Sequence, residues 1–480
     1  MISNDHRDQS EQSSVVLNND DVEKGASKDY HHHPAQTTVH DAVFGEIAEG
    51  EGPNYRAVGP KGAFVLLTKV NLGLGVLGLP KVMNALGLIP GLIVIFTIMI
   101  VFTYCATMIG KFKLAHPEVY SIADAAYVFG GRWAKEFWFF GLTLQMIFFV
   151  AAGCVGISTA LNAVSGHATC TAVFIAVGGV LAFLLGSIRT LGKITWIGWV
   201  GLASLLIAIF IVTIAVGVQD RPSAAPQHGP FDKEFRLFGK STFGQATSGV
   251  NQILFAYGST PMFFGVASEM REPRQFTRAM QGSMYFLTVI YVVVGTVVYV
   301  YCGKYVASPS LGSAGPLLKK ICYGIAIPGL LATLTLFTHM AAKNIFVRVL
   351  AGSKHLTSNS IVHWSTWLGI TAGCAIIGYV IASAIPIFDT LLSFIGALVV
   401  PSLCVIPYTL MWWHDNYRYV PKEERTAKLR FFAFVNVVCF FIGIYLTAAG
   451  AYGAIDELIH TSVDAKPWSC ADNSGTVKAS

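Results

Sequence analysis

Two stretches of the sequence decide the fold: Asn71-Leu-Gly-Leu-Gly-Val-Leu-Gly-Leu-Pro80 and Phe255-Ala-Tyr-Gly-Ser-Thr-Pro261. Both contain Gly and Pro, and each lies inside a long apolar run. A helix that opens inside a bilayer leaves backbone N–H and C=O groups without partners, which is costly unless something replaces the lost bonds. We therefore expect each break to line a ligand site, an ion site or a water-filled cavity.

The composition around these stretches is that of a polytopic membrane protein. Of 480 residues, 54% are hydrophobic and 12% charged, which is far more apolar than a soluble domain. A helical span needs about 20 mostly apolar residues, and this rule predicts an all-α chain with about eleven spans: 62–86, 90–112, 136–164, 169–187, 195–217, 243–267, 280–302, 321–349, 361–384, 388–411 and 431–453.

These spans divide the chain into three parts. The polar residues 1–57 are expected to form a disordered cytosolic tail, residues 58–455 the membrane domain, and residues 456–480 a short extracytosolic tail. With the N-terminus in the cytosol, about sixteen Lys and Arg residues of the loops face the cytosol and about seven the other side. The basic residues are dispersed over many loops, so the net charge of +6 does not predict nucleic-acid binding.

The positions of the two breaks predict an internal repeat. The breaks fall in the first and the sixth span, so five spans separate them, and an odd number of spans inverts the second copy in the membrane. Gly/Pro-interrupted segments at matching places in two halves indicate a transporter site at the repeat interface. We therefore expect a 5+5 inverted repeat with discontinuous spans one and six.

The two breaks are predicted to have opposite polarity. Helix restarts present unpaired N–H groups and partial positive charge, so we expect residues 71–75 to hold a carboxylate, with Pro80 in the first turn of the outer half-helix. In the sixth span, the half-helix that ends near Phe255–Tyr257 presents carbonyls that suit an ammonium group. Ser259 and Thr260 are expected N-caps of the following half. Together the carboxylate site and the ammonium site describe a receptor for an α-amino acid. The alternative explanation of the glycines is close packing of small residues between helices.

The same residues resemble a known family. The run from Lys69 to Pro80 is similar to the first-span signature of the amino acid/auxin permease family, and Phe255–Gly258 with Ser268–Pro273 is similar to its sixth span. The tract from Phe337 to Arg348 resembles the eighth span of fungal neutral amino acid permeases. The resemblance covers about residues 58–455 and implies an eleven-span, LeuT-like (APC-type) fold that moves amino acids with protons or sodium, in the plasma or vacuolar membrane. Ser-Thr-Pro follows Gly258 where the family often has His, so no role is carried over for that His.

Several specific residues are therefore expected to act in binding and coupling. The predicted substrate-binding residues are Asn71, Leu72, Gly73, Leu74, Gly75, Phe255, Ala256, Tyr257 and Ser259. Charged or titratable groups at membrane depth are functional candidates, and the predicted coupling and gating residues are Lys69, His339, Thr338 and Glu269. Snorkelling of Lys69, hydrogen bonding of a buried His339 and back-bonding of Thr338 are the structural alternatives. Glu269 and Glu272 are expected to form inner-gate ion pairs with Arg271 and Arg274, and a plain cluster of charges at the membrane interface is the alternative.

The residue types around the breaks constrain substrate and coupling ion. Near the breaks, Asn71, Tyr257, Ser259, Thr260, Met262 and Phe263 include no acid, so a neutral, apolar or aromatic amino acid is the predicted substrate. The Lys69 ammonium can occupy the place that a sodium ion takes in other transporters, which favours protons as the coupling ion. A sodium site from Thr333, Thr335 and Thr338 is the alternative. No cofactor is predicted, ATP is not indicated because no G-x-x-x-x-G-K-[ST] run occurs, and the expected partners are the amino acid and the lipid bilayer, with no nucleic acid and an undetermined oligomeric state.

Three classes of function remain to be compared. A secondary amino acid transporter, proton-coupled and in the plasma membrane, is the leading hypothesis, with sodium coupling or a vacuolar location as variants. A non-transporting amino acid sensor is the second class. A membrane enzyme is the third, but its nearest candidate pair, His414 and Asp415, is adjacent on a helix and is predicted to point about 100° apart.

The nine cysteines are dispersed without metal-ligand spacing, so no metal site is predicted. Four of them lie near the predicted outer face, where an oxidising compartment permits one disulfide: Cys170, Cys302, Cys322 and Cys470.

Overall fold

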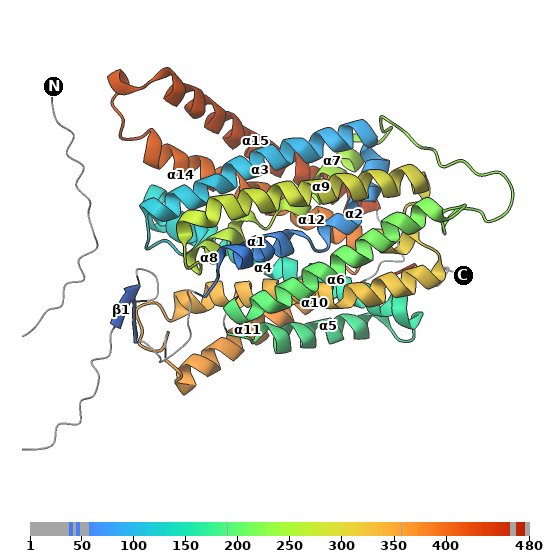
Figure 1. The fold of residues 1–480 in the computed structure, drawn as a ribbon, viewed down its shortest axis with the longest axis horizontal. Coiled ribbons are helices and arrows are strands. Elements are labelled where there is room, and N and C mark those ends of the chain that lie inside the picture. The colour runs from blue at the N-terminus through green and yellow to red at the C-terminus, as the bar shows by residue number, and fades with distance from the viewer. Residues whose placement is uncertain are drawn as a thin grey trace, which may run out of the picture.

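The computed structural model is a bundle of helices that run side by side along the long axis of the molecule (Figure 1). It describes residues 38–41, 45–48, 57–189, 191–356, 358–460 and 467–475. A short antiparallel strand pair, β1 (Thr38–Asp41) with β2 (Gly45–Ala48), precedes the bundle. Disorder was expected for residues 1–57; apart from this strand pair and Ala57, that tail lies outside the described residues.

Every predicted apolar stretch coincides with a helix or a broken helix. The first five are α1 (Pro60–Asn71) with α2 (Gly75–Leu86), α3 (Leu88–Ala115), α4 (Ile122–Ser165), α5 (Thr171–Gly186) and α6 (Leu191–Val218). The others are α7 (Phe243–Tyr257) with η1 (Thr260–Met262) and α8 (Phe263–Ser268), then α9 (Phe276–Cys302), α10 (Pro316–Val349), α11 (Ile361–Ala384), α12 (Phe388–Leu398) with α13 (Val400–Cys404) and α14 (Ile406–Asn416), and α15 (Ala427–His460). Short 3₁₀ turns occupy the connections as η2 (Pro273–Gln275), η3 (Gly303–Tyr305), η4 (Ser310–Ser313) and η5 (Lys422–Glu424).

The all-helical fold class is confirmed, while the count of eleven is not. Among the described residues, seven single helices are long and apolar enough to cross a membrane, and nine spans result if each of two bent pairs counts as one. Helix α5 has 16 residues, and the sixth predicted span is divided into three short pieces. Both therefore fall below the length that a single helix needs to cross a membrane.

Both predicted breaks are present, with different details. Helix α1 ends at Asn71 and α2 begins at Gly75, at a bend of 47°. Pro80 lies inside α2, beyond its first turn, so the expected position for Pro80 is wrong: the helix restarts at the earlier glycine. Helix α7 ends at Tyr257 as predicted. Ser259 precedes η1, but its side chain accepts no capping hydrogen bond; its hydroxyl donates instead to the Val70 carbonyl.

A third break was not predicted. The tenth span bends by 46° between α12 and the segment 400–416, and Val399 and Val405 separate its three helical pieces. Pro401 and Pro407 each stand near the start of a piece, where a missing N–H is tolerated. Residues 388–411 were expected to form one span, because these prolines are not accompanied by a glycine cluster.

Two sets of helices pack closely within the bundle. The first set contains α4, α5, α10 and α11, and the second contains α1, α2, α3, α7 and α9; α6 packs on α10 of the first set and on α1 and α9 of the second, while α12 and α15 pack on α7. In the second set α2 packs on α7 and α1 on α8, so the two broken spans run antiparallel with their breaks at one depth. The end of the bundle at which α1 begins is called the N-terminal face, and the other end the opposite face.

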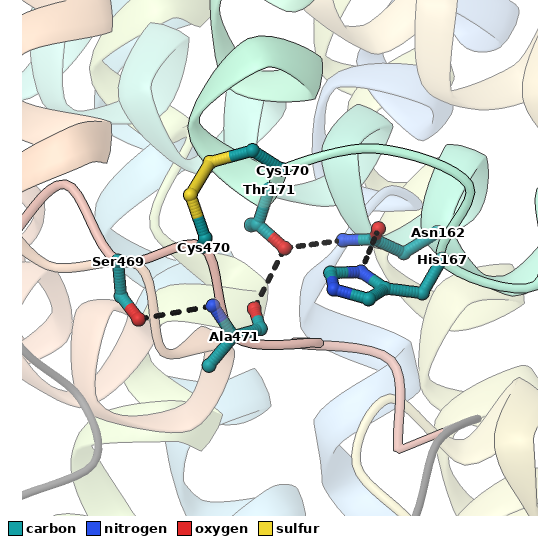
Figure 2. The surroundings of a disulfide bond; sticks show 7 residues. All are labelled: Asn162, His167, Cys170, Thr171, Ser469, Cys470 and Ala471. Atoms are coloured by element: carbon teal, nitrogen blue, oxygen red, sulfur yellow. Dashed lines mark hydrogen bonds between the residues drawn. A yellow bond between two sulfur atoms is a disulfide. The ribbon is translucent and has the colours of Figure 1, made fainter.

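The C-terminal segment 467–475 is fastened to the opposite face (Figure 2). Cys470 forms a disulfide with Cys170, which immediately precedes α5. The Thr171 hydroxyl donates to the Ala471 carbonyl at 2.7 Å, and the Asn473 amide donates to Ser158 Oγ of α4 at 2.9 Å. One disulfide among the four predicted cysteines is thus confirmed, while Cys302 and Cys322 are free and buried.

Candidate functional site

The two helix breaks contact each other directly. The Ser259 backbone N–H donates to Asn71 Oδ1 at 3.2 Å, and the Ser259 hydroxyl donates to the Val70 carbonyl at 2.8 Å. A Cβ placed on Gly75 would lie 2.5 Å from the Cα of Ala256, which is closer than any side chain permits. The glycine therefore allows the restart of α2 to pack against the end of α7.

Tyr291 of α9 ties the breaks together and was not predicted from the sequence. Its hydroxyl oxygen lies 2.9 Å from the Asn71 carbonyl oxygen and 2.8 Å from that of Ala256. Each of these carbonyls belongs to one of the two breaks. The single proton of the Tyr291 hydroxyl is shared between them, so one buried group bridges both breaks. A tyrosine inside an apolar span is a weak signal, since amphipathic aromatics are common at membrane depth without such a role.

A small cavity lies between the breaks. Its volume is about 10 Å³, and it is lined by Val70, Asn71, Gly73, Leu74, Gly75, Phe149, Phe255, Ser259 and Phe337. The lining contains six of the nine predicted binding residues. Phe149 of α4 and Phe337 of α10 were not predicted; the centroid of the Phe149 ring lies 5.0 Å from that of Phe255 and 4.9 Å from that of Phe337.

Three predicted binding residues lie outside this lining. The Leu72 carbonyl accepts a hydrogen bond from Lys69, and Ala256 packs against Gly75. The Tyr257 hydroxyl is 2.7 Å from Thr288 Oγ1, and its ring packs edge-on against Tyr291. Tyr257 therefore faces α9 in this structure and is not part of the cavity lining.

Lys69 is fully buried beside the first break. Its ammonium donates to the Leu72 carbonyl at 2.9 Å and to Thr333 Oγ1 of α10 at 2.5 Å. The charged group thus joins the opened end of α1 to the eighth predicted span. A snorkelling lysine would place its ammonium at the interface, and this one is directed into the protein.

The threonines of α10 use their hydroxyl protons within their own helix. Thr333, Thr335 and Thr338 each donate to the carbonyl four residues earlier, which is a common use of threonine in membrane helices. Thr333 also accepts the bond from Lys69. Thr338 places its methyl group against Gly186 and is not adjacent to the cavity.

The predicted gate residue Glu269 has a different partner from the one expected. Its carboxylate pairs with Lys343 of α10 at 2.5 Å, and the two side chains are only 2% and 4% exposed. The backbone N–H of the neighbouring Arg271 donates to the Val58 carbonyl, and the Val58 N–H to that of Glu269. Tertiary packing therefore brings α10 and residue 58 to the end of α8, whereas sequence proximity suggested Arg271 and Arg274.

His339 lies in the same region as this ion pair. Its Nδ1 is 2.7 Å from the Ile188 carbonyl, and its ring packs edge-on against Trp367. Together with Glu269 and Lys343 it lines a cavity of about 20 Å³ between the breaks and the N-terminal face. The structure thus brings His339 and Glu269 together.

A much larger cavity opens on the opposite face. This vestibule has a volume of about 890 Å³ and extends between α2, α7, α12 and α15 as far as Gln252, one helical turn before Phe255. Its wall carries acids and bases: Lys81, Glu234, Arg236, Lys240, Lys304, Asp389, Asp456 and Glu457. The hydrogen bond from Lys304 lowers the pKa of the Glu234 carboxyl, which keeps that acid ionised.

A second polar residue near the breaks was also missed. Gln145 of α4 is buried and donates from its amide to the Gly258 carbonyl at 2.8 Å, and Cys404 of α13 contacts the same carbonyl at 3.3 Å. Gln145 stands in an apolar stretch of the sequence, and a glutamine at membrane depth was the signal that could have identified it as a site residue.

The broken, antiparallel helices around a central cavity define the class of protein. The fold is that of a solved nucleobase-cation-symport-1 family transporter, Mhp1, in a closed conformation with bromovinylhydantoin bound: the TM-score is 0.52 at 12% identity, covering 90% of this chain and 99% of that one. The chain is an integral, multi-pass membrane protein with the LeuT-like fold.

The family follows from sequence. Residues 58–456 match the family described as transmembrane amino acid transporter protein, and the chain belongs to it. It is 32% identical to a transmembrane transporter of Gibberella moniliformis over 95% of this chain and 94% of the relative. It is also 32% identical to an N amino acid transport system protein of Neurospora crassa, over 89% and 91%. The chain is therefore a secondary transporter of the amino acid transporter family.

Proposed function

We propose that this protein imports neutral, apolar or aromatic amino acids into the cytosol by proton-coupled symport with alternating access. The observation that carries the proposal is the meeting of two oppositely polarised helix breaks at one small cavity. The start of α2 presents N–H groups to a carboxylate, and the end of α7 presents carbonyls to an ammonium group. Family membership and the name of the Neurospora relative support amino acids as the cargo.

The cavity lining supports a neutral side chain. It contains three phenylalanines, Phe149, Phe255 and Phe337, and among its residues there is neither an acid nor a base. A charged side chain would lose its hydration there without gaining a partner. A cavity of about 10 Å³ is smaller than an amino acid, so binding requires the aromatic side chains to move apart, as alternating access demands.

Lys69 supports protons as the coupling ion. Its ammonium lies between a carbonyl freed by the α1 break and a threonine hydroxyl of α10, where oxygen ligands from the same two elements could otherwise hold a sodium ion. A lysine that loses its proton in such a place would lose the charge that strengthens both contacts. Proton binding would then be linked to the position of α1 relative to α10.

The disulfide supports the orientation. Cys170–Cys470 lies on the opposite face, and disulfides persist in oxidising compartments. This supports a cytosolic N-terminal face, in agreement with the basic loops, with the vestibule as an extracytosolic entrance. We propose the plasma membrane as the site of action; fractionation of cells that express the chain tests this against the vacuolar alternative.

Uptake into proteoliposomes tests the function. The purified full chain is reconstituted, an inward proton gradient is imposed without sodium, and labelled leucine, phenylalanine and arginine are followed. We expect leucine or phenylalanine to accumulate above the external concentration and arginine not to accumulate. An ionophore that collapses the proton gradient should abolish the accumulation.

Each other outcome overturns a stated part of the proposal. Accumulation of neutral amino acids only with a sodium gradient would refute proton coupling and identify sodium. Accumulation of arginine alone would refute the neutral substrate class. Binding of leucine without uptake under either gradient would refute transport and favour a sensor.

A further inference from the structure

A cluster of possible metal ligands lies on the N-terminal face, away from the transport cavity. His116 directly follows α3, and His414 and Asp415 lie in the last turn of α14. His116 and Asp415 are separated by 299 residues in sequence, so no spacing motif could have revealed them. The fold brings together the ends of the second and tenth spans.

The three side chains converge on one point. His116 Nε2 is 3.1 Å and His414 Nδ1 is 3.0 Å from Asp415 Oδ1, and one donor atom from each residue lies within 4.8 Å of the others. The expectation that His414 and Asp415 point apart is therefore wrong. Their Cβ atoms diverge, but at the end of the helix the carboxylate can turn back toward the neighbouring imidazole.

The second nitrogen of each imidazole also faces an oxygen. His414 Nε2 lies 3.4 Å from the Tyr419 hydroxyl, within hydrogen-bond distance, whereas His116 Nδ1 lies 3.7 Å from a Glu118 carboxylate oxygen, which is an ion-pair separation and too long for a hydrogen bond. Metal-bound histidines almost always donate the remaining ring N–H to an oxygen, which fixes the tautomer and orients the ring, and both histidines have an oxygen near that nitrogen.

We propose that His116, His414 and Asp415 form a binding site for a divalent transition metal of the zinc class. Two imidazole nitrogens and one carboxylate oxygen are borderline ligands that suit Zn²⁺, whereas Ca²⁺ and Mg²⁺ prefer oxygen alone. Bonds of about 2.0–2.2 Å in a tetrahedron separate ligand atoms by roughly 3.3 Å, close to the observed 3.0 and 3.1 Å. The side chains are 13–24% exposed, so water can fill the fourth position.

Metal in this site would connect α3 to α14. Helix α14 is the N-terminal-face part of the bent tenth span, and α12, the other part, borders the vestibule. A bound ion would restrain the end of the tenth span against the second span. The site is independent of the substrate cavity, and its existence can be tested by binding alone.

The experiment measures Zn²⁺ binding to the purified full chain by titration calorimetry. A background in which His31, His32 and His33 are replaced by alanine removes binding by that histidine run. In this background we expect one Zn²⁺ per chain, lost in His116→Ala and in Asp415→Asn. His228→Ala, which removes an exposed histidine on the opposite face, should bind like the parent. Glu118→Gln should weaken the affinity by about 10- to 100-fold.

A second measurement excludes misfolding as the cause of lost binding. A ligand that binds only the folded state raises apparent stability, so Zn²⁺ should raise the Tm of the background protein and of His228→Ala, and EDTA should reverse this. His116→Ala and Asp415→Asn should keep the metal-free Tm of the parent and show no shift with Zn²⁺. Unchanged Zn²⁺ affinity in both variants, or the lack of any Zn²⁺ binding to the background protein, would overturn the proposal and leave a surface ion-pair cluster.

Discussion

At the scale of single residues, Gly75 has the sharpest steric requirement near the cavity. The Cα of Ala256 stands 2.5 Å from where its Cβ would be. We predict that Gly75→Val abolishes uptake while the protein still inserts into the membrane, because the branched side chain separates the two breaks and obstructs the carboxylate site. Uptake and surface expression are to be measured together.

The control is Gly369→Val, which changes a glycine of α11. A Cβ added at Gly369 would have no atom within 4 Å. This variant should transport like the wild type. Wild-type affinity in Gly75→Val would refute the assignment of this break to the substrate.

Lys69 gives a second residue-scale prediction, which concerns pH. Lys69→Ala should remove the dependence of uptake on the proton gradient, because the group proposed to bind the proton is gone, and leave at most downhill exchange. The measurement is uptake of labelled leucine over a range of imposed gradients. Lys61→Ala, at the exposed start of α1, should keep the wild-type dependence; the same dependence in Lys69→Ala would leave Lys69 a structural role only.

At the scale of elements, the ion pair between Glu269 and Lys343 fastens the end of α8 to α10. Removing one partner of a buried pair leaves an uncompensated charge, which costs about 3–5 kcal/mol. We predict that Glu269→Gln lowers thermal stability in detergent clearly, and that the double variant Glu269→Gln with Lys343→Met recovers most of the loss. Thermal unfolding of the three proteins is the measurement.

The half-exposed pair between Glu136 and Arg348 serves as the comparison. A surface pair contributes about 0–1 kcal/mol, so Glu136→Gln should hardly change the Tm. If Glu269→Gln were equally harmless, or the double variant no better than the single one, the pair would not hold these elements together.

The helix breaks show which elements could be predicted from sequence. Glycines and caps revealed the breaks in the first and sixth spans because these residues change local backbone preference. The bend at Val399 was missed because Val399 itself favours regular structure and the nearby Pro401 can also begin a helix. Local sequence patterns locate a helix break only where the residues that cause the break also lie within it.

The partners of site residues depended on the tertiary fold. The sequence identified Lys69 and Glu269 as buried charges, but Thr333 and Lys343 both come from α10, far away in the chain. Tyr291 and Phe149 could not be selected from the many aromatic residues of the spans without coordinates. Residue types and periodicity predict the elements, whereas the contacts between elements decide which side chains meet.

At the scale of the whole molecule, the C-terminal segment connects two parts of the bundle. Helix α15 packs on α7 and α12, while residues 470–473 are bound to α4 and α5. We predict that Cys470→Ser lowers the free energy of unfolding by about 2–4 kcal/mol, seen as a lower Tm under non-reducing conditions. Cys302→Ser removes a free cysteine, so this variant should keep the stability that the disulfide provides.

Dithiothreitol should lower the Tm of the wild type toward that of Cys470→Ser and leave the variant unchanged. A variant as stable as the wild type would mean that the hydrogen bonds of residues 467–475 suffice without the covalent bond.

The same disulfide orders events during synthesis. Its two cysteines are 300 positions apart, and all helices from α5 to α15 lie between them in the chain. The bond can therefore form only after the ribosome has finished α15 and the C-terminal segment has reached the opposite face. Its oxidation marks a chain in which the helices from α5 to α15 have been made, and a shift in mobility on non-reducing gels would distinguish such molecules from less mature ones.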